Sequence, residues 1–259
     1  MQISIVIPVF NSEEILERLT KTINDELKIK LNETGFEVLF INDFSSDRSW
    51  EKIKKLSLNY KFVKGINLAK NFGQHNAIMA GFNYCSGDYV ITMDDDLQHH
   101  PKFILNIFEA LKDCDACYTY YKKRKHKNWK KFVSWSNNIV TSFLLNKPFY
   151  IYLSSFRGLK KNIIKKIKNF KDPNVYLDSL IISSTKNIKM ITIDHQERYV
   201  GESNYNLKKL FILWSDMLLN FSLKPIRFSS ILGFILKTLV KFIRRDKKLD
   251  QYIIKEKTF

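Results

Sequence analysis

Short apolar runs alternate with helical patterns through the first 121 residues, and this alternation limits the fold more than any other feature of the sequence. The predicted strands are Ile3–Pro8, Phe36–Ile41, Phe62–Leu68, Tyr89–Met93 and Ala116–Tyr121. The predicted helices between them are Ser12–Lys30, Asp47–Leu58, Gln74–Cys85 and Pro101–Leu111. Repeated strand–helix units of this kind predict an α/β fold, in which a mainly parallel sheet carries helices on both faces.

Polar residues stand directly after the predicted strands. In open parallel sheets, ligands bind beyond the carboxyl ends of the strands. We therefore expect a binding site at the edge of the sheet that these residues share. They are Asn11, Asn42 and Asp43, Lys70 and Asn71, and the run Asp94 to Asp96.

The pattern changes after residue 121. A basic loop is followed by a predicted amphipathic helix at Trp129–Asn146, a turn at 154–157, helices at Leu159–Lys168 and Val175–Ser184, and a strand at Met190–Ile193. We predict one domain over residues 1–225, with halves 1–121 and 122–225. Residues 226–259 are predicted to form a basic, amphipathic helical appendage.

Basic residues outnumber acidic ones by 43 to 26, which gives a formal net charge of +17. Such a surface attracts nucleic acid, anionic lipid or a phosphorylated substrate. One cluster, Lys237–Lys248, follows an apolar stretch whose longest uncharged part is Phe228–Leu236. This part is far shorter than the roughly 20 residues of a spanning helix. The pattern favours attachment to an anionic membrane surface, and the alternative is a solvated basic face.

The three cysteines cannot form a fully paired disulfide set, which indicates a reducing compartment. Cys114 and Cys117 have the spacing of a metal or redox pair. However, no second pair or histidine partner stands at zinc-finger spacing, and the segment leads into a predicted strand. We therefore expect both thiols to pack in the core.

Three consecutive carboxylates, Asp94, Asp95 and Asp96, follow the fourth predicted strand. Like charges this close repel one another unless a cation neutralises them. Their hard oxygen ligands suit Mg²⁺ or Mn²⁺, and an ion held by one or two carboxylates usually completes its shell with substrate phosphates. The alternative is a polar helix N-cap.

Five segments of the first hundred residues resemble family 2 glycosyltransferases in the family's own order. The resemblance is closest to the polyprenyl-phosphate sugar transferase branch, which includes dolichyl-phosphate mannose synthase, and it extends to about residue 235. The five segments are Ser4–Asn11 with Glu13, Ile41–Asp47, Leu68–Gly73 with Ala80-Gly81, Ser86–Asp88 and Asp94–Gln98; later ones are Arg198–Tyr205, Lys208–Leu210 and Pro225–Arg227.

This resemblance implies an enzyme with a GT-A fold that takes a sugar from a nucleoside diphosphate donor, UDP- or GDP-linked, with inversion at the anomeric carbon. Residues 1–121 would then form the half that binds the nucleotide sugar. Residue by residue, the resemblance assigns Pro8, Phe10 and Glu13 to the nucleoside border, Asp43 to the base, Lys70 to the nucleotide, Asp94 and Asp95 to donor binding, and Asp94, Asp96 and Gln98 to the metal.

The resemblance places the acceptor in the second half of the chain. Arg124, Arg157 and Arg198 fall where the branch has basic residues for an acceptor phosphate, and Gly201 and Ser203 match the family's flexible lid. The alternatives are an ordinary solvated charge for Arg124 and a plain surface loop for the lid. Arginine suits phosphate because its planar fork binds two oxygens at once.

Two further residues on this side bear on the chemistry. Ser155 stands where some transferases of the branch carry an aspartate. Asp178 is the remaining candidate for a general base, and its alternative is a carboxylate on a helix surface. A hydroxyl acceptor needs such a base, whereas a phosphate monoester is largely ionised near neutral pH and needs less help.

The sequence departs from the family at two positions of the second strand end. Phe44 stands where the family usually has glycine, and Asn42 replaces the first aspartate of the usual pair. The retained carboxylate, Asp43, still suits base recognition, although the shape of the base pocket must differ.

Two acceptors are compatible with the sequence: polyprenyl phosphate, or a hydroxyl of a lipid-linked oligosaccharide or surface polysaccharide precursor. Either would place the enzyme on the cytoplasmic, inner face of the cell membrane as a peripheral protein. A non-catalytic nucleic-acid-binding protein would explain the positive charge, but it would leave the acidic run unexplained. We therefore expect no nucleic-acid partner.

Overall fold

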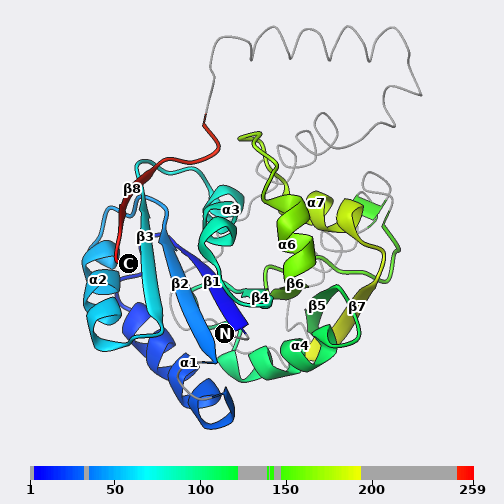
Figure 1. Ribbon diagram of the computed structural model, residues 1–259, viewed down its shortest axis with the longest axis horizontal. Helices are drawn as coiled ribbons and strands as arrows, with labels where there is room; N and C mark the ends of the chain where they lie inside the picture. Colours follow the sequence, from blue (N-terminus) through cyan, green and yellow to red (C-terminus); the bar gives the residue numbers. More distant parts are fainter. Residues whose placement is uncertain (1–2, 32–34, 122–138, 140, 143–146, 194–249) are drawn as a thin grey trace, which may run out of the picture.

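Figure 1 shows a computed structural model of the chain, which describes residues 3–31, 35–121, 139, 141–142, 147–193 and 250–259. The strands are β1 (Ile3–Val9), β2 (Phe36–Asn42), β3 (Val63–Leu68), β4 (Tyr89–Thr92), β5 (Ala116–Tyr121), β6 (Arg157–Lys160), β7 (Ile188–Ile193) and β8 (Ile254–Lys257). The helices are α1 (Leu16–Leu31), α2 (Ser49–Asn59), α3 (Gln74–Tyr84), α4 (Ile104–Leu111), α6 (Lys161–Ile167) and α7 (Leu177–Ser184), with a short 3₁₀ helix, η1 (Pro101–Phe103), before α4.

In the described residues the strands form one eight-stranded sheet in the order β7-β5-β6-β4-β1-β2-β3-β8. The central strands β4, β1, β2 and β3 are parallel, and β5 is parallel to β7. Every strand and helix predicted for the first 121 residues is present. The predicted α/β fold with a mainly parallel sheet is confirmed.

Helices cover both faces of the sheet, because alternate residues of the central strands point in opposite directions. Ile5 and Ile7 of β1 pack in a cluster with α1, α2 and α4, whereas Val6 packs with α3, α6 and α7. The two layers are visible on either side of the strands in Figure 1. Gly81 lets α3 press onto β1, since a Cβ atom there would lie 2.4 Å from Cγ1 of Val6.

Strand β6 was not expected, and it corrects the prediction of a helix over Leu159–Lys168. Residues Arg157–Lys160 form a strand that pairs antiparallel with both β4 and β5, and helix α6 begins only at Lys161. This insertion brings the 154–157 turn beside the end of β4, where Thr92 donates a hydrogen bond to the carbonyl of Ser155 (2.6 Å).

The end of the chain also differs from the expected appendage. Strand β8 pairs antiparallel with β3 at the edge of the sheet. The indole Nε1 of Trp50 donates to the carboxylate of Glu256 (2.8 Å), and the backbone N–H of Gly65 donates to Oγ1 of Thr258 (2.9 Å). Residues 254–257 therefore form the edge strand of the main sheet rather than part of an appendage.

Other predicted features fall outside the described residues or agree with them. The predicted helices at Leu207–Phe221 and Ile226–Ile243 lie outside the described part, as does most of Trp129–Asn146. Cys114 and Cys117 are buried free thiols, as expected from core packing. Among the helices that the structure describes, none combines the length and apolarity needed to cross a membrane.

Candidate active site

Three loops that follow strands carry unusual backbone conformations. Asn11 after β1, Phe44 after β2 and Leu97 after β4 have φ angles of 54°, 61° and 57°. Side chains other than glycine rarely adopt this left-handed region, and such residues cluster at functional sites. The angle at Phe44 also explains why glycine suits this position in the family that the sequence resembles. The strain lies along the edge of the sheet where a ligand site was predicted.

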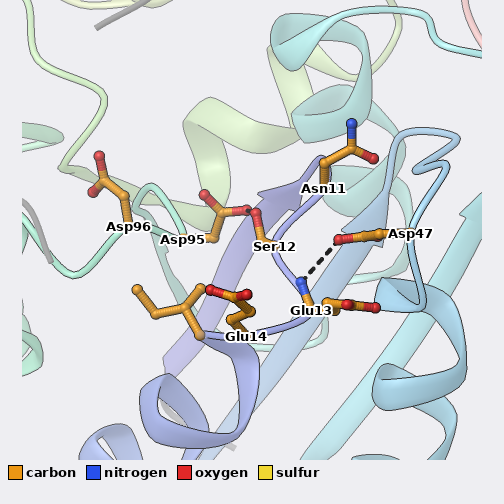
Figure 2. A pocket seen from close by; sticks show the side chains of 8 residues that line it. Asn11, Ser12, Glu13, Glu14, Asp47, Asp95 and Asp96 are labelled. Atoms are coloured by element: carbon orange, nitrogen blue, oxygen red, sulfur yellow. Dashed lines mark hydrogen bonds between the residues drawn. The ribbon is translucent and has the colours of Figure 1, made fainter. Parts of the chain in front are cut away.

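A cavity of about 280 Å³ opens at this edge, between the loops that follow β1, β2 and β4 (Figure 2). It brings together three of the predicted donor-site residues, Glu13, Asp95 and Asp96. Most of its lining side chains carry oxygen atoms and could accept hydrogen bonds or bind a cation. The lining residues are Asn11, Ser12, Glu13, Glu14, Ile15, Asp47, Asp95 and Asp96.

Glu13 and Asp47 clamp two of these loops together. The backbone N–H of Glu13 donates to Oδ2 of Asp47 (3.0 Å), and the backbone N–H of Arg48 donates to Oε2 of Glu13 (2.7 Å). Oδ1 of Asp47 also accepts from the N–H of Ser49 (2.9 Å), at the start of α2. Both carboxylates therefore fix the wall of the cavity.

The three carboxylates after β4 have different partners. Asp94 accepts hydrogen bonds from Nε2 of Gln74 and from Oγ of Ser155, both at 2.6 Å. Asp95 accepts from Oγ of Ser12 (2.5 Å), and Figure 2 shows its carboxylate beside that hydroxyl. Burial raises the pKa of Asp95 to about 6, and the neighbouring charges of Asp94 and Asp96 add to the rise.

Asp96 caps its own loop, since its Oδ1 accepts from the backbone N–H of Gln98 (3.0 Å). Among the described residues, no group of three or more histidine, cysteine or carboxylate side chains converges as a ready-made metal cage. The oxygen donors and the excess negative charge at Asp94–Asp96 fit a hard divalent ion that takes its remaining ligands from substrate phosphates. The oxygen ligands of this run are therefore compatible with the metal that the sequence predicted at Asp94, Asp96 and Gln98.

Asp43 is buried at the end of β2 and organises the loop before α3. Its two oxygens accept from the backbone N–H groups of Phe72 (2.7 Å) and Gly73 (2.8 Å). Burial raises the pKa of Asp43, and these two hydrogen bonds partly offset the rise. Gly73 adopts a φ of 84°, which a residue with a side chain would adopt only under strain.

Two residues near Asp43, Lys70 and Asn42, differ in exposure and in their contacts. Lys70 is exposed, and its ammonium lies 5.0 Å from the centre of the Phe72 ring. Asn42, which replaces the first aspartate of the family pair, donates from Nδ2 to Oδ1 of Asn67 (2.8 Å) and accepts from Oγ of Ser45 (2.6 Å). The substitution therefore gives a neutral amide that joins β2 to β3.

A buried polar cluster joins β5, β6 and α7. The Arg157 guanidinium forms an ion pair with Oδ1 of Asp178, and the phenol of Tyr118 donates to the same oxygen (2.8 Å). Burial and the charge of Asp178 raise the pKa of Tyr118 well above its ordinary value, so this phenol stays protonated. Asp178 is only 6% exposed and Arg157 only 2%.

One alternative for Asp178, a carboxylate on the surface of a helix, is wrong, because the side chain is buried. The guanidinium of Arg157 is also buried, where it pairs with Asp178. Lys147 lies nearby and donates from Nζ to the carbonyl of Ile151 (2.6 Å) and to Oγ of Ser142 (2.8 Å). Burial lowers the pKa of Lys147 to about 8, although the charge of Asp178 opposes the fall.

The remaining predicted residues divide between the rim and the undescribed part. Pro8 is half-buried near the end of β1, and Phe10 is 52% exposed in the loop that follows. Arg124, Arg198 and Ser203 lie outside the described residues.

Sequence reasoning missed several side chains that fix the site. Ser12, Gln74 and Tyr118 each donate a hydrogen bond to one of the site carboxylates. Ser12 follows the flagged Asn11, and Gln74 begins a predicted helix directly after the Lys70–Gly73 loop. Ser12 and Gln74 lie in or directly after loops that follow strands, and this position could have marked them as site residues. Nothing in the local sequence marked Tyr118 within its strand.

The sequence pattern of glycosyl transferase family 2 matches residues 4–168, which include the cavity, the acidic run and the 154–157 turn. The chain belongs to glycosyl transferase family 2. It is therefore a glycosyltransferase, and its eight-stranded sheet is a GT-A fold.

Two relatives illustrate where the chain stands in glycosyl transferase family 2. An uncharacterized glycosyltransferase of Bacillus subtilis, YkcC, is 32% identical over 244 residues, which cover 91% of this chain and 73% of the relative. The undecaprenyl-phosphate 4-deoxy-4-formamido-L-arabinose transferase of Yersinia enterocolitica is 30% identical over 237 residues, covering 91% of this chain and 72% of the relative. The chain thus has relatives in the polyprenyl-phosphate branch of the family.

A solved structure with the same fold is that of glucosyl-3-phosphoglycerate synthase from Mycobacterium tuberculosis, in complex with Mn²⁺, UDP and phosphoglyceric acid. It superposes with a TM-score of 0.61 at 14% identity and covers 84% of this chain and 76% of that one. At this identity the likeness shows the fold alone, and it supports the GT-A assignment of this family 2 chain.

Proposed function

We propose that this enzyme transfers a sugar from a nucleoside diphosphate donor, UDP- or GDP-linked, to polyprenyl phosphate, with the help of Mg²⁺ or Mn²⁺ and with inversion. One observation carries the proposal: the hydrogen bond from Ser155 to Asp94 (2.6 Å). It joins the carboxylates after β4 to the turn that opens the acceptor half. A donor held at the first and an acceptor held at the second would meet at this contact.

The donor half supplies fixed oxygen ligands and a shaped wall. Gln74 and Ser155 hold Asp94, and Ser12 holds Asp95, so the carboxylates need not reorganise when the donor binds. A bound divalent ion would neutralise the charge that develops on the leaving diphosphate. Glu13 and Asp47 form the wall of the cavity, and Asp43 orders the loop that carries Lys70.

The acceptor half favours a phosphate over a hydroxyl. In the transfer, an acceptor oxygen forms a bond to the anomeric carbon as the bond from that carbon to the diphosphate oxygen breaks on the opposite face. A phosphate monoester is largely ionised near neutral pH and needs little help from a base. This suits a site whose candidate base, Asp178, is already bound by Arg157 and Tyr118. The named function of the Yersinia relative supports the same acceptor class.

An assay of the purified protein with Mn²⁺, a panel of sugar nucleotides and either polyprenyl phosphate or a lipid-linked saccharide tests the proposal. We expect a polyprenyl phosphate product whose mass has risen by one glycosyl residue, and no such product when the metal is chelated. A product formed only on the lipid-linked saccharide would instead assign the hydroxyl of that saccharide as acceptor and overturn the phosphate proposal.

We further propose that the enzyme acts at the cytoplasmic, inner face of the cell membrane as a peripheral protein. The basic, apolar segment proposed to attach it narrows to residues 226–249, because the following residues lead into β8. This segment should bind anionic vesicles through its lysines and arginines, and salt should weaken the binding.

Flotation with vesicles of anionic or neutral lipid measures this attachment. We expect the chain to float with anionic vesicles and to be released as the salt concentration rises. Replacing Lys237 and Lys241 by glutamate should reduce flotation, whereas the same change at the exposed Lys30 of α1 and Lys55 of α2 serves as a charge-matched control. Equal binding to neutral vesicles, or resistance to extraction by high salt and alkaline carbonate, would contradict peripheral attachment.

A further inference from the structure

The first turn of α3 contains a histidine whose ring nitrogen is not satisfied by the protein. Nδ1 of His75 is buried and has no hydrogen-bond partner among the described residues. Leaving a buried polar atom unpaired costs free energy, and native proteins rarely tolerate it without a reason. A bound ligand is one such reason.

The residues on either side of His75 bond to two different parts of the structure, the acidic run after β4 and the segment before α7. On the preceding residue, Nε2 of Gln74 donates to Asp94 (2.6 Å). On the following residue, Nδ2 of Asn76 donates to the carbonyl of Pro173 (2.9 Å), in the segment that leads to α7. The His75 ring meets Tyr176 edge-on, with ring centres 5.3 Å apart.

Charges from both halves act on this imidazole. Its pKa falls to about 4, chiefly because of burial; Asp178 and Asp94 oppose the fall, and Arg157 contributes to it. Near neutral pH the ring is therefore uncharged, with one nitrogen as donor and the other as acceptor. An uncharged ring of this kind suits a sugar hydroxyl better than a phosphate anion, which Lys and Arg bind more strongly.

We propose that His75 contacts a hydroxyl of the donor sugar and helps to determine which sugar is transferred. The proposal rests on the proposed function, in which the diphosphate lies at Asp94–Asp96 and the acceptor lies at the 154–157 turn, which ends at the Arg157–Asp178 pair. The transferred sugar must bridge these two places. His75 lies on the helical turn whose neighbouring residues contact Asp94 and the segment before α7, the helix of Asp178, and the Nδ1 of His75 has no partner in the part of the chain that the structure describes.

Two substitutions separate this role from simple packing. His75→Phe keeps a ring against Tyr176 but removes both nitrogens. His75→Asn loses the ring but keeps an amide near the position of Nδ1. Thermal unfolding of both variants checks that the fold persists. If His75 only packs against Tyr176, His75→Phe should bind the sugar nucleotide normally and His75→Asn should bind it more weakly. We expect the reverse order.

Calorimetry in Mn²⁺ gives the decisive comparison, with UDP against UDP-glucose and GDP against GDP-mannose as probes. For the pair that the wild type binds, we expect His75→Phe to leave the affinity for the nucleoside diphosphate unchanged. Its affinity for the sugar nucleotide should fall about tenfold, the scale of one lost hydrogen bond between neutral groups, and His75→Asn should recover part of this loss.

Other outcomes distinguish the failure of this proposal from that of the proposed function. An equal loss for the nucleoside diphosphate and the sugar nucleotide would place His75 at the nucleotide and overturn the proposal. If His75→Phe leaves the affinity for the sugar nucleotide unchanged but raises the KM for polyprenyl phosphate, His75 lies at the acceptor. That result would also overturn the proposal. Failure of the wild type to bind any of the four probes would count against both this proposal and the donor class of the proposed function.

Discussion

Replacing Asp96 with alanine is expected to abolish metal-dependent donor binding while the fold persists. The three carboxylates after β4 have different hydrogen-bond partners, and Oδ1 of Asp96 accepts from the backbone N–H of Gln98 in its own loop. Removing it takes away one of the two proposed side-chain ligands of the ion. Turnover should fall on the order of 10²- to 10³-fold or more, the scale for losing one stabilising contact to developing charge.

Calorimetry with a nucleoside diphosphate, with and without Mn²⁺, measures this effect. In the variant, the affinity with Mn²⁺ should fall to the level that the wild type shows without it. Asp113→Ala is the matched control, because this aspartate is exposed and pairs with Lys189 outside the site. Unchanged metal-dependent affinity in Asp96→Ala would rule out the metal assignment.

Substituting Asp178 with asparagine is expected to destabilise the protein strongly. The change leaves the guanidinium of Arg157 buried without its counter-charge. Breaking a buried ion pair from one side typically costs about 3–5 kcal/mol of unfolding free energy. Denaturant unfolding should also show that Arg157→Met is costly alone, and that the double variant loses less than the sum of the two.

The exposed pair of Asp88 and Lys161 provides the control for this cycle, since removing an exposed partner typically costs less than about 1 kcal/mol. If the losses of unfolding free energy in Asp178→Asn and Arg157→Met were strictly additive in the double variant, the two buried side chains would not interact, which would contradict the ion pair.

Turnover of the folded Asp178 variant tests the acceptor. With polyprenyl phosphate we expect a mild reduction per folded molecule, and a severe one in Arg198→Ala through lost phosphate contacts. A reduction on the order of 10²-fold or more in Asp178→Asn, with donor affinity unchanged, would instead identify a general base and a hydroxyl acceptor. Near-normal turnover in both variants would reject both residues as parts of the acceptor site.

The first half of the fold was predictable because its signals are local. Each parallel strand there is a short apolar run followed by a helical pattern, and burial on both faces of the sheet demands that composition. Strands β6 and β8 lack this signal. Residues Arg157–Lys160 include a glycine and two basic residues, and Ile254–Lys257 has charged side chains at three of four positions. Both are strands because the sheet offers a partner, and a contact such as Trp50 to Glu256 cannot be deduced from neighbouring residues.

The candidate site was predictable at its strand ends but not in its interior. Asp43, Asp94 and Asp95 lie at the expected edge because parallel strands end there together. The burial of Asp178 in α7 was not predictable, because it depends on Tyr118 of β5 and Arg157 of β6, which are distant in the sequence. His75 likewise reads as an ordinary helix residue until the structure shows that its buried Nδ1 has no hydrogen-bond partner among the described residues.

The central claim concerns the atom that receives the sugar, and the most direct measurement is the NMR spectrum of the product formed when the active sugar nucleotide is supplied with both polyprenyl phosphate and a lipid-linked saccharide. Transfer to the phosphate predicts an anomeric proton whose signal is split by phosphorus, with a configuration opposite to that in the donor. An anomeric signal without coupling to phosphorus, from a sugar attached to a hydroxyl of a lipid-linked saccharide, would contradict the account.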